Sequence, residues 1–330
     1  MRRIAVVFCA FLAFALAAWP RAAENSLRRL FAETHDFWDC DWSPDGCLLA
    51  LAGKQHYQPA EKSRIWLWKA REERLVLLTN TEAYCDDWPR WSPDGGHLAL
   101  VRRELTGARR TCIWWKEMAT GAGRRLTPGP DDRQPSWSPD GRAIVFRRGL
   151  GPTASTLAVW EAATGKVRNL PIPPGLVGEP FWGGDGAIYY TRYRLVERET
   201  KIGEQIYRVE VIAGGRLWRY DPATGQGGAV SPEEFDQRMP SLSPDGRWLA
   251  FYGQRGGEGP AASIPDPARW ALYVRDQATG RLKEVVADVA LTGGPPAWSR
   301  DGRTIIFYSL RQKFPALWSY SLADLLGTGS

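Results

Sequence analysis

A four-residue motif recurs six times along the chain and sets its architecture. The motif is Ser-Pro-Asp-Gly or a near copy of it, with an aromatic residue or Leu before it and a short apolar run behind it. Successive copies lie 45 to 60 residues apart, in or just above the span of about 40 to 50 residues that one four-stranded unit of a closed array needs. Together with the aromatic residue or Leu before each of them, the six copies occupy residues 42–46, 91–95, 137–141, 182–186, 242–246 and 298–302.

Each copy has the composition of a β-hairpin turn. Pro suits the first corner of a type I turn, Asp suits the second, and Gly accepts the left-handed conformation that closes a bulged hairpin. The apolar runs behind the turns, such as Ile144–Phe146, are too short for helices and rich in strand-forming residues. A second turn of the Ala-Thr-Gly type, as at 119–121, separates two further strands. Each repeat is therefore predicted to be a four-stranded antiparallel meander.

One meander cannot bury both of its faces, so the repeats must stack around an axis. We predict an all-β, six-bladed β-propeller in which the motif Trp residues pack between neighbouring blades. The chain has 17 Trp residues, and nearly all of them are interpreted as core. The last repeat supplies only three strands, ending near Leu322, whereas Leu27–Phe31 resembles the fourth strand of the other blades. The N-terminal strand is therefore expected to complete the sixth blade.

The first residues have the pattern of an export signal. Met1-Arg2-Arg3 precedes an apolar stretch from Ile4 to Trp19, which is shorter than the roughly 20 residues needed to span a bilayer securely. We predict a signal peptide at 1–23, cleaved after Ala17 or Ala23, and one propeller domain at 24–330. An uncleaved signal anchor is the alternative. No second apolar segment follows, so a periplasmic or secreted protein without membrane insertion after cleavage is expected.

Charge and cysteine content narrow the class of protein. The formal net charge is +6, and loss of three arginines with the leader would leave a weakly basic chain, which predicts no nucleic-acid partner. An oxidising compartment would permit disulfides among the cysteines outside the leader. We predict a Cys85–Cys112 disulfide, because the meander directs both residues toward one face. Buried free thiols are the alternative.

The motifs of common enzymes are missing. The sequence has no G-x-S-x-G nucleophile elbow, no H-E-x-x-H zinc motif, no C-x-x-C pair and no Walker loop. His35, His56 and His97 fall in different blades or loops, which favours surface positions over a shared metal site. No catalytic residue and no cofactor are predicted, apart from a calcium ion that the channel could hold.

The expectation of a calcium ion in the channel rests on acidic residues in the loops that lead into the first strands of the repeats. In a propeller these loops converge around one mouth of the central channel. A negative ring there would bind a hard cation such as Ca²⁺ or a basic peptide, whereas ordinary solvated turn residues are the alternative. The predicted ring comprises Asp36, Asp39, Asp86, Asp87, Asp131, Asp132, Glu179, Glu233, Glu234 and Asp236.

Arginines follow on the same face, at the junction of the second and third strands. Acidic residues close to the channel axis and arginines farther out would form a docking face with both charges. The alternative is that these arginines only keep the strand edges soluble. Two long insertions, at 192–216 and 253–269, are candidates for specificity elements. The arginines are Arg102, Arg103, Arg109, Arg110, Arg147 and Arg148.

The repeated pattern W-S-P-D-G-x-x-[LI]-[AV]-[LF], with its D-x-x-T-G turns, resembles the TolB-type six-bladed propeller, a Pro-Asp variant of the WD-like repeat. The resemblance covers about Leu27 to Leu322. It implies an exported scaffold that engages protein partners of the cell envelope, often with a cation in the channel. TolB also carries an α/β domain before its propeller, and we expect this chain to lack one. The same repeats build propeller domains of prolyl oligopeptidase-like peptidases and of some polysaccharide lyases.

The sequence therefore predicts a monomeric, exported, non-catalytic propeller that binds a protein or peptide of the cell envelope at an acidic channel mouth. The rival hypothesis is a secreted lyase or hydrolase with its site in the channel, for which His35, Glu179, Tyr193 and Arg238 are the candidate residues. A purely structural subunit is the third possibility.

Overall fold

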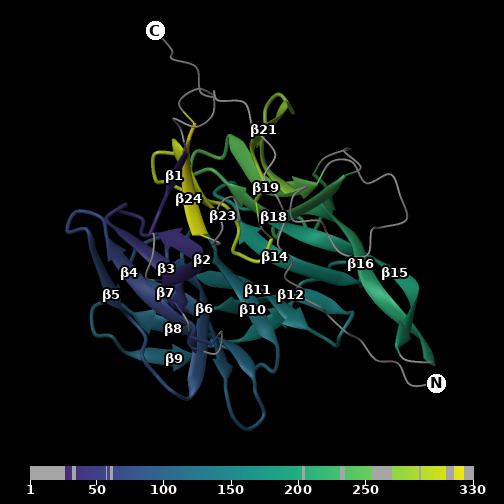
Figure 1. Cartoon of the computed structure of the whole chain (residues 1–330), viewed down its shortest axis with the longest axis horizontal. Coiled ribbons are helices and arrows are strands. Elements are labelled where there is room, and N and C mark those ends of the chain that lie inside the picture. Colours follow the sequence, from purple (N-terminus) through teal and green to yellow (C-terminus); the bar gives the residue numbers. More distant parts are fainter. Residues whose placement is uncertain are drawn as a thin grey trace.

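The computed structural model describes residues 27–31, 35–56, 58–59, 62–202, 205–230, 235–254, 270–289, 291–309 and 316–322. Within these ranges the regular structure consists of β-strands, and no helix long and apolar enough to cross a membrane occurs among them. The strands form six four-stranded antiparallel sheets, which Figure 1 shows arranged around a common axis. The predicted all-β, six-bladed propeller is confirmed.

Each blade runs from an innermost first strand to an outermost fourth strand. Blades one and two consist of β2 (His35–Trp42), β3 (Leu48–Gln55), β4 (Arg64–Lys69), β5 (Arg74–Leu77), β6 (Tyr84–Trp91), β7 (His97–Glu104), β8 (Thr111–Glu117) and β9 (Gly123–Arg125). Blades three and four consist of β10 (Asp132–Trp137), β11 (Ala143–Gly149), β12 (Ser155–Glu161), β13 (Val167–Asn169), β14 (Leu176–Trp182), β15 (Ile188–Ile202), β16 (Gln205–Tyr220) and β17 (Gly227–Ala229). Blades five and six consist of β18 (Asp236–Leu242), β19 (Trp248–Gln254), β20 (Trp270–Asp276), β21 (Leu282–Ala287), β22 (Ala297–Trp298), β23 (Thr304–Ser309), β24 (Ala316–Ser321) and β1 (Leu27–Arg29).

The repeated tetrad forms the hairpin turn between the first two strands of each blade. In blade one the Gly46 N–H donates to the Ser43 carbonyl at 2.8 Å, and the Ser43 hydroxyl donates to Asp45 Oδ1 at 2.5 Å. Gly46 has a φ of +71°, a conformation that a residue with a side chain adopts only under strain. The sequence of the tetrad is therefore explained by the turn that it builds.

The N-terminal strand closes the ring as predicted. β1 pairs antiparallel with β24, so that Leu27 lies opposite Tyr320. Just beyond β1, the Phe31 ring packs edge-on against Phe37 and Trp68 of blade one, with ring centroids 5.5 and 5.1 Å apart. The segment thus completes blade six and also packs against blade one.

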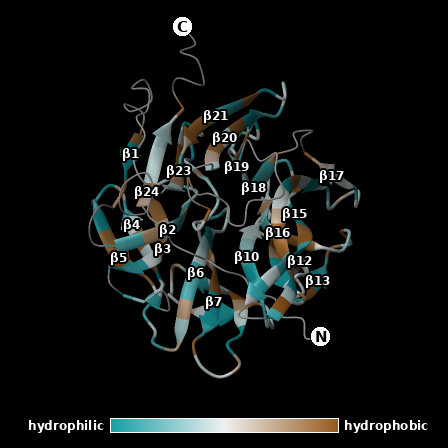
Figure 2. Cartoon of the chain, turned by 45° about the vertical axis from the view of Figure 1, so that its right-hand side comes forward, coloured by the Kyte–Doolittle hydropathy of each residue, from teal (hydrophilic) through white to brown (hydrophobic). Residues whose placement is uncertain are grey.

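The apolar core lies mainly between the blades. Trp137, the motif residue of blade three, packs against Ala99, Val101 and Ile113 of blade two, and its indole N–H donates to the Arg90 carbonyl at 3.0 Å. Figure 2 shows hydrophobic stretches inside strands such as β16 and β20. Full burial of one large apolar side chain stabilises a fold by about 1.5–3 kcal/mol, so these contacts between blades hold the ring together.

Candidate binding site at the channel mouth

The first strands of the six blades line the axis of the propeller. β2, β6, β10, β14, β18 and β22 contact one another in this order, and β22 contacts β2, so the ring is continuous. The first strands of blades one to five each start near an acidic residue of the predicted ring, and all six first strands end at their tetrads. The acidic residues therefore lie around one end of the channel, which we call the mouth, and the tetrad turns lie around the other end.

Two of the acidic residues are structural members of buried ion pairs. Asp86 accepts hydrogen bonds from Arg102 Nε and Nη2 at 2.7 and 2.8 Å, and Asp132 accepts them from Arg148 Nε and Nη2 at 2.8 and 3.0 Å. Both carboxylates are fully buried. Each acid and its arginine are direct partners across the first two strands of a blade, which explains why the arrangement recurs.

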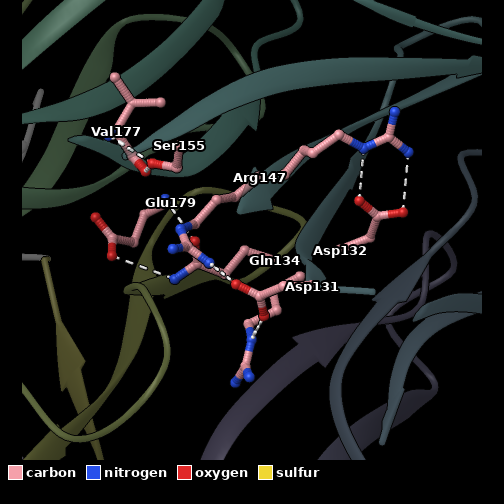
Figure 3. A network of polar contacts seen from close by, with 9 residues as sticks. Asp131, Asp132, Gln134, Arg147, Ser155, Val177 and Glu179 are labelled. Atoms are coloured by element: carbon pink, nitrogen blue, oxygen red, sulfur yellow. Dashed lines mark hydrogen bonds and ion pairs between the residues drawn. The ribbon is translucent and has the colours of Figure 1, made fainter. Parts of the chain in front are cut away.

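The remaining described acids of the ring also have polar partners. Figure 3 shows Asp131 beside Arg147, whose Nη1 lies 3.0 Å from Asp131 Oδ2, and Arg133 donates to the same carboxylate. The other pairs are Asp36 with Lys54 and His56, Asp39 with Arg90, Asp87 with the Trp38 indole N–H, Glu179 with Tyr193, and Asp236 with Arg238. Glu233 and Glu234 lie outside the described residues.

Several arginines of the predicted outer set pair with acids of the predicted ring. Arg102, Arg147 and Arg148 neutralise acids of their own blade, and Arg103 hydrogen-bonds the Cys85 thiol. Arg109 and Arg110 lie exposed in the turn beyond β7. Among the described residues, no group of three or more His, Cys, Asp or Glu side chains is arranged to hold a metal ion.

Four residues with left-handed backbone lie at equivalent positions of the first strands of blades two to five, and the sequence analysis had singled out only Glu179 among them. Trp88, Gln134, Glu179 and Met239 have φ values of +52°, +57°, +47° and +57°, and each lies at a β-bulge in the first strand of its blade. Left-handed backbone in residues other than Gly costs of order 1–3 kcal/mol and is typical of binding and active sites. The sequence does mark these positions, because a Pro directly follows each of the four residues. Each Pro lies two positions before the Trp or Leu that precedes the tetrad.

The channel is filled by side chains at this level. The cavity that Trp88, Gln134, Glu179 and Phe181 line has a volume of about 10 Å³, enough for about one water molecule. A sugar ring or a peptide side chain does not fit there without movement of the wall. A ligand that binds at this end of the channel therefore has to contact the described residues of the mouth from outside.

Glu179 forms the centre of a polar cluster between blades three, four and five. The Tyr193 hydroxyl lies 2.7 and 2.6 Å from the two carboxylate oxygens of Glu179, and Gln134 Nε2 donates to Oε1 at 3.2 Å, as Figure 3 shows for Gln134. The Arg238 guanidinium lies 5.3 Å from the centre of the Tyr193 ring. Burial, together with the charge of Glu179, raises the pKa of Tyr193 well above its ordinary value.

Three of the four residues of the rival enzyme hypothesis thus meet in one cluster. His35 is not one of them, because it lies on β2 in blade one, where its ring stacks on Phe37 at 5.3 Å. Burial lowers the pKa of His35. His56 pairs with Asp36, and His97 stacks on Trp115, so the three His residues do not share a site.

A second cluster lies between blades one and two. The Arg90 guanidinium contacts both carboxylate oxygens of Asp39 at 3.2 and 3.1 Å. Asp87 accepts the Trp38 indole N–H at 2.8 Å, and Asp41 accepts the Trp91 backbone N–H at 2.7 Å. Burial raises the pKa of Asp41 and of Asp87 to about 7, so both carboxyl groups titrate near neutral pH.

The predicted Cys85–Cys112 disulfide is wrong for this structure, in which the four described cysteines are free thiols. Cys85 lies on β6 and Cys112 on β8, and β7 separates them. Two strand spacings of about 4.8 Å place the Cα atoms farther apart than the roughly 7 Å that a disulfide tolerates. The strand predicted after the tetrad at 91–95 already lies between the two cysteines, and the expected disulfide did not take its width into account.

The first long insertion forms a two-stranded arm at the mouth. β15 and β16 remain paired from the blade out to Ile202 opposite Gln205, and Figure 1 shows them projecting from the ring. Ile206 is 67% exposed and Ile212 is 40% exposed. The second insertion falls almost wholly at 255–269, outside the described residues.

Comparison with known proteins supports the fold. No family model matches the chain. It is 26% identical over 187 residues to the uncharacterized peptidase YuxL of Bacillus subtilis (strain 168), a match that covers 49% of this chain and 28% of YuxL. The chain therefore spans less than a third of the length of that curated relative.

The similar solved structures cover more of this chain than YuxL does. TolB from Acinetobacter baumannii has a TM-score of 0.62 and 16% identity, with 87% of this chain and 63% of TolB covered. The oligogalacturonate lyase from Vibrio parahaemolyticus has a TM-score of 0.57 and 13% identity, with 92% and 96% covered. These likenesses confirm that the chain has the six-bladed propeller fold of TolB.

Proposed function

We propose that this chain is an exported, monomeric scaffold that binds a protein or peptide of the cell envelope at the channel mouth. The observation that carries the proposal is the connection of the arm to the mouth. Tyr193, at the base of the arm, donates to Glu179, and the Gly215 N–H on the other strand donates to Asp236 Oδ1 at 2.7 Å. Arm and mouth thus form one continuous surface. The resemblance to TolB supports an envelope location.

The arm itself has the chemistry of a docking element. A two-stranded ribbon is at best marginally stable in water, and contact with a partner would stabilise it. Partners across the ribbon share a face, so that Val196 pairs with Val211 on one face and Glu199 ion-pairs with Arg208 on the other. No described strand pairs with the outer edge of β15 beyond Tyr193 or with that of β16 before Trp218, so an extended peptide can join either edge as a further strand.

The ion pairs at the mouth change the kind of partner that we propose. A basic peptide attracted by an acidic ring would have to displace Arg102, Arg147 and Arg148 from their carboxylates. Removing one partner of a buried pair costs about 3–5 kcal/mol, which disfavours such exchange. We therefore propose recognition through backbone pairing and apolar contact along the arm.

The test is a variant in which residues 195–212 are replaced by an Asn-Gly turn, which shortens β15 and β16 to ordinary length. Binding of wild type and variant to solubilised envelope proteins of the native host is compared at equal concentrations. We expect the partner to be lost while the melting temperature changes little, because the arm contributes no strand to the ring. The double variant Glu199→Ala/Arg208→Ala, which removes only an exposed ion pair, serves as the control. A partner retained by the arm-less variant would contradict the proposal.

The contact of Tyr193, Glu179 and Arg238 supports a second candidate function, acid–base cleavage of an acidic saccharide, which the likeness to the oligogalacturonate lyase also suggests. A Tyr hydroxyl on a carboxylate beside a guanidinium can exchange a proton with a bound substrate. The small cavity weighs against it, because no sugar ring fits beside the cluster. Turnover of oligogalacturonates that disappears in Tyr193→Phe would place this function first.

A further inference from the structure

A second concave site lies at the end of the channel opposite the mouth. The hairpin turns of blades six, one and two enclose a depression of about 360 Å³, lined among others by Asp45, Trp91, Asp94 and Arg300. β6 alone has eight residues, so this site lies roughly 25 Å from the mouth. It is therefore distinct from the surface described above.

Arg300 departs from the repeat at this place. Four of the six tetrads have Pro at its position, where Pro packs against the turn of the next blade, as Pro44 does 3.6 Å from the Cβ position of Gly95. Arg300 keeps that packing with its Cβ, 3.9 Å from the Cβ position of Gly46. Its exposed guanidinium forms no ion pair with a described carboxylate, although Asp45 and Asp94 line the same depression. The substitution thus adds an unpaired cation to the site.

The Trp91 indole lines the depression and can report on its occupancy. Trp137 and Trp298 donate Nε1–H to the carbonyl before the motif residue of the preceding blade, at 3.0 and 3.1 Å. Trp91 is 7% exposed, and its Nε1 finds no acceptor among the described residues. The Nε1 atom of Trp42 likewise finds none, and both atoms are buried, so the Trp91 indole serves as a probe of its surroundings and not as a donor to a ligand.

Asp45 and Asp94 supply fixed negative charge. Oδ1 of Asp45 accepts from the Ser43 hydroxyl and the Cys47 N–H, and Oδ1 of Asp94 accepts from the Ser92 hydroxyl and the Gly96 N–H. The serine hydroxyls hold the pKa of both carboxyl groups below the ordinary range, so both are ionised at neutral pH. Oδ2 of each receives no hydrogen bond from a described residue, which leaves it open to a ligand.

We propose that this depression binds a small zwitterion, an amino acid or a short peptide, with its ammonium group on Asp45 and Asp94 and its carboxylate on Arg300. Unpaired charges of both signs in one hollow match a ligand that carries both signs. A simple anion would meet two carboxylates, and a neutral sugar would leave all three charges unpaired. The volume lies near the lower limit of ligand pockets, which suits a ligand of this size.

The test is titration of the full chain with glycine, dialanine and trialanine, followed by calorimetry and by the Trp indole N–H signals of ¹⁵N-labelled protein. The Trp91 signal is assigned by its loss in Trp91→Phe, which keeps an aromatic ring in place. We expect saturable binding that shifts this signal. The N-acetyl and the C-terminal amide forms of trialanine should each bind at least tenfold more weakly, because each lacks one charge.

Arg300→Pro is the decisive variant, because it restores the residue of the repeat and should not disturb the fold. It should weaken trialanine binding at least tenfold. Arg303→Ala, which removes an exposed arginine of the same hairpin outside the depression, is the matched control and should bind as wild type does. Unchanged affinity in Arg300→Pro, an equal response to glucose, or no shift of the Trp91 signal up to the solubility limit of the peptides would overturn the proposal.

Discussion

The buried ion pair of blade two allows a quantitative test of how the mouth is built. Asp86 is fully buried, and Arg102 lies between the rings of Tyr84 and Trp114, 4.9 and 4.7 Å from their centres. Asp86→Ala removes the carboxylate and leaves the guanidinium without its partner in a largely dry site. Loss of one member of such a pair destabilises proteins by about 3–5 kcal/mol. We expect Asp86→Ala to lower the free energy of unfolding by an amount in this range.

Most of that cost comes from the charge left behind, so it should shrink when both members are replaced. In a double-mutant cycle with Arg102→Met, the double variant should be at least about 2 kcal/mol more stable than the sum of the single changes predicts. Met fills part of the space of the arginine stem and can still contact the two rings.

Urea unfolding followed by Trp fluorescence measures these differences without adding salt that would screen the pair. The Glu161–Arg168 pair, whose side chains are 40% and 53% exposed, is the matched control, and its coupling should be about 0.2–1 kcal/mol. A coupling between Asp86 and Arg102 no larger than that of the control would refute the view that the mouth acids are structural.

Two further predictions concern the cluster between blades one and two. Because burial raises the pKa of Asp87 to about 7, its protonated form stabilises the fold fully below about pH 4, and this contribution is lost as the pH rises through 7. Asp87→Asn should therefore leave stability unchanged at pH 4 and increase it at pH 8 in urea titrations, whereas an equal effect at both values would contradict the assignment. Separately, a Cβ on Gly294 would lie 1.8 Å from Asp39 Oδ1, so Gly294→Ala should displace Asp39 from Arg90 and destabilise the fold by about 3 kcal/mol. Gly228→Ala, where a Cβ meets no atom within 4 Å, should change stability by less than about 1 kcal/mol, and similar losses in both variants would exclude the explanation.

The fold could be predicted because its determinants are local and repeated. A turn tetrad, an apolar run and a second turn recur in each repeat, so an error in one copy is corrected by the others. The closing strand was predictable for the same reason, since Leu27–Phe31 resembles a fourth strand and the last repeat lacks one. Such signals need no knowledge of side-chain contacts.

The site was harder to predict because it depends on register between strands. Asp86 and Arg102 are 16 residues apart, as are Asp132 and Arg148. That spacing follows from two strands joined by the tetrad turn, but the acids and the arginines were assigned to separate rings before their pairing was considered. The free charge of Arg300 was visible as the one basic residue in place of Pro, yet its role depends on two carboxylates from neighbouring blades.

The closure of blade six also sets an order of events during synthesis. The Ser319 hydroxyl donates to the Arg28 carbonyl across a separation of 291 residues, so the first strand is made long before its partner. At 5–20 residues per second, roughly 15 to 60 s pass before β24 exists. During that interval β1 stays unpaired while the blades are completed one after another, and the open edge of the newest blade is exposed to other chains. The synthesis of β24 therefore converts an open stack, prone to association, into a ring.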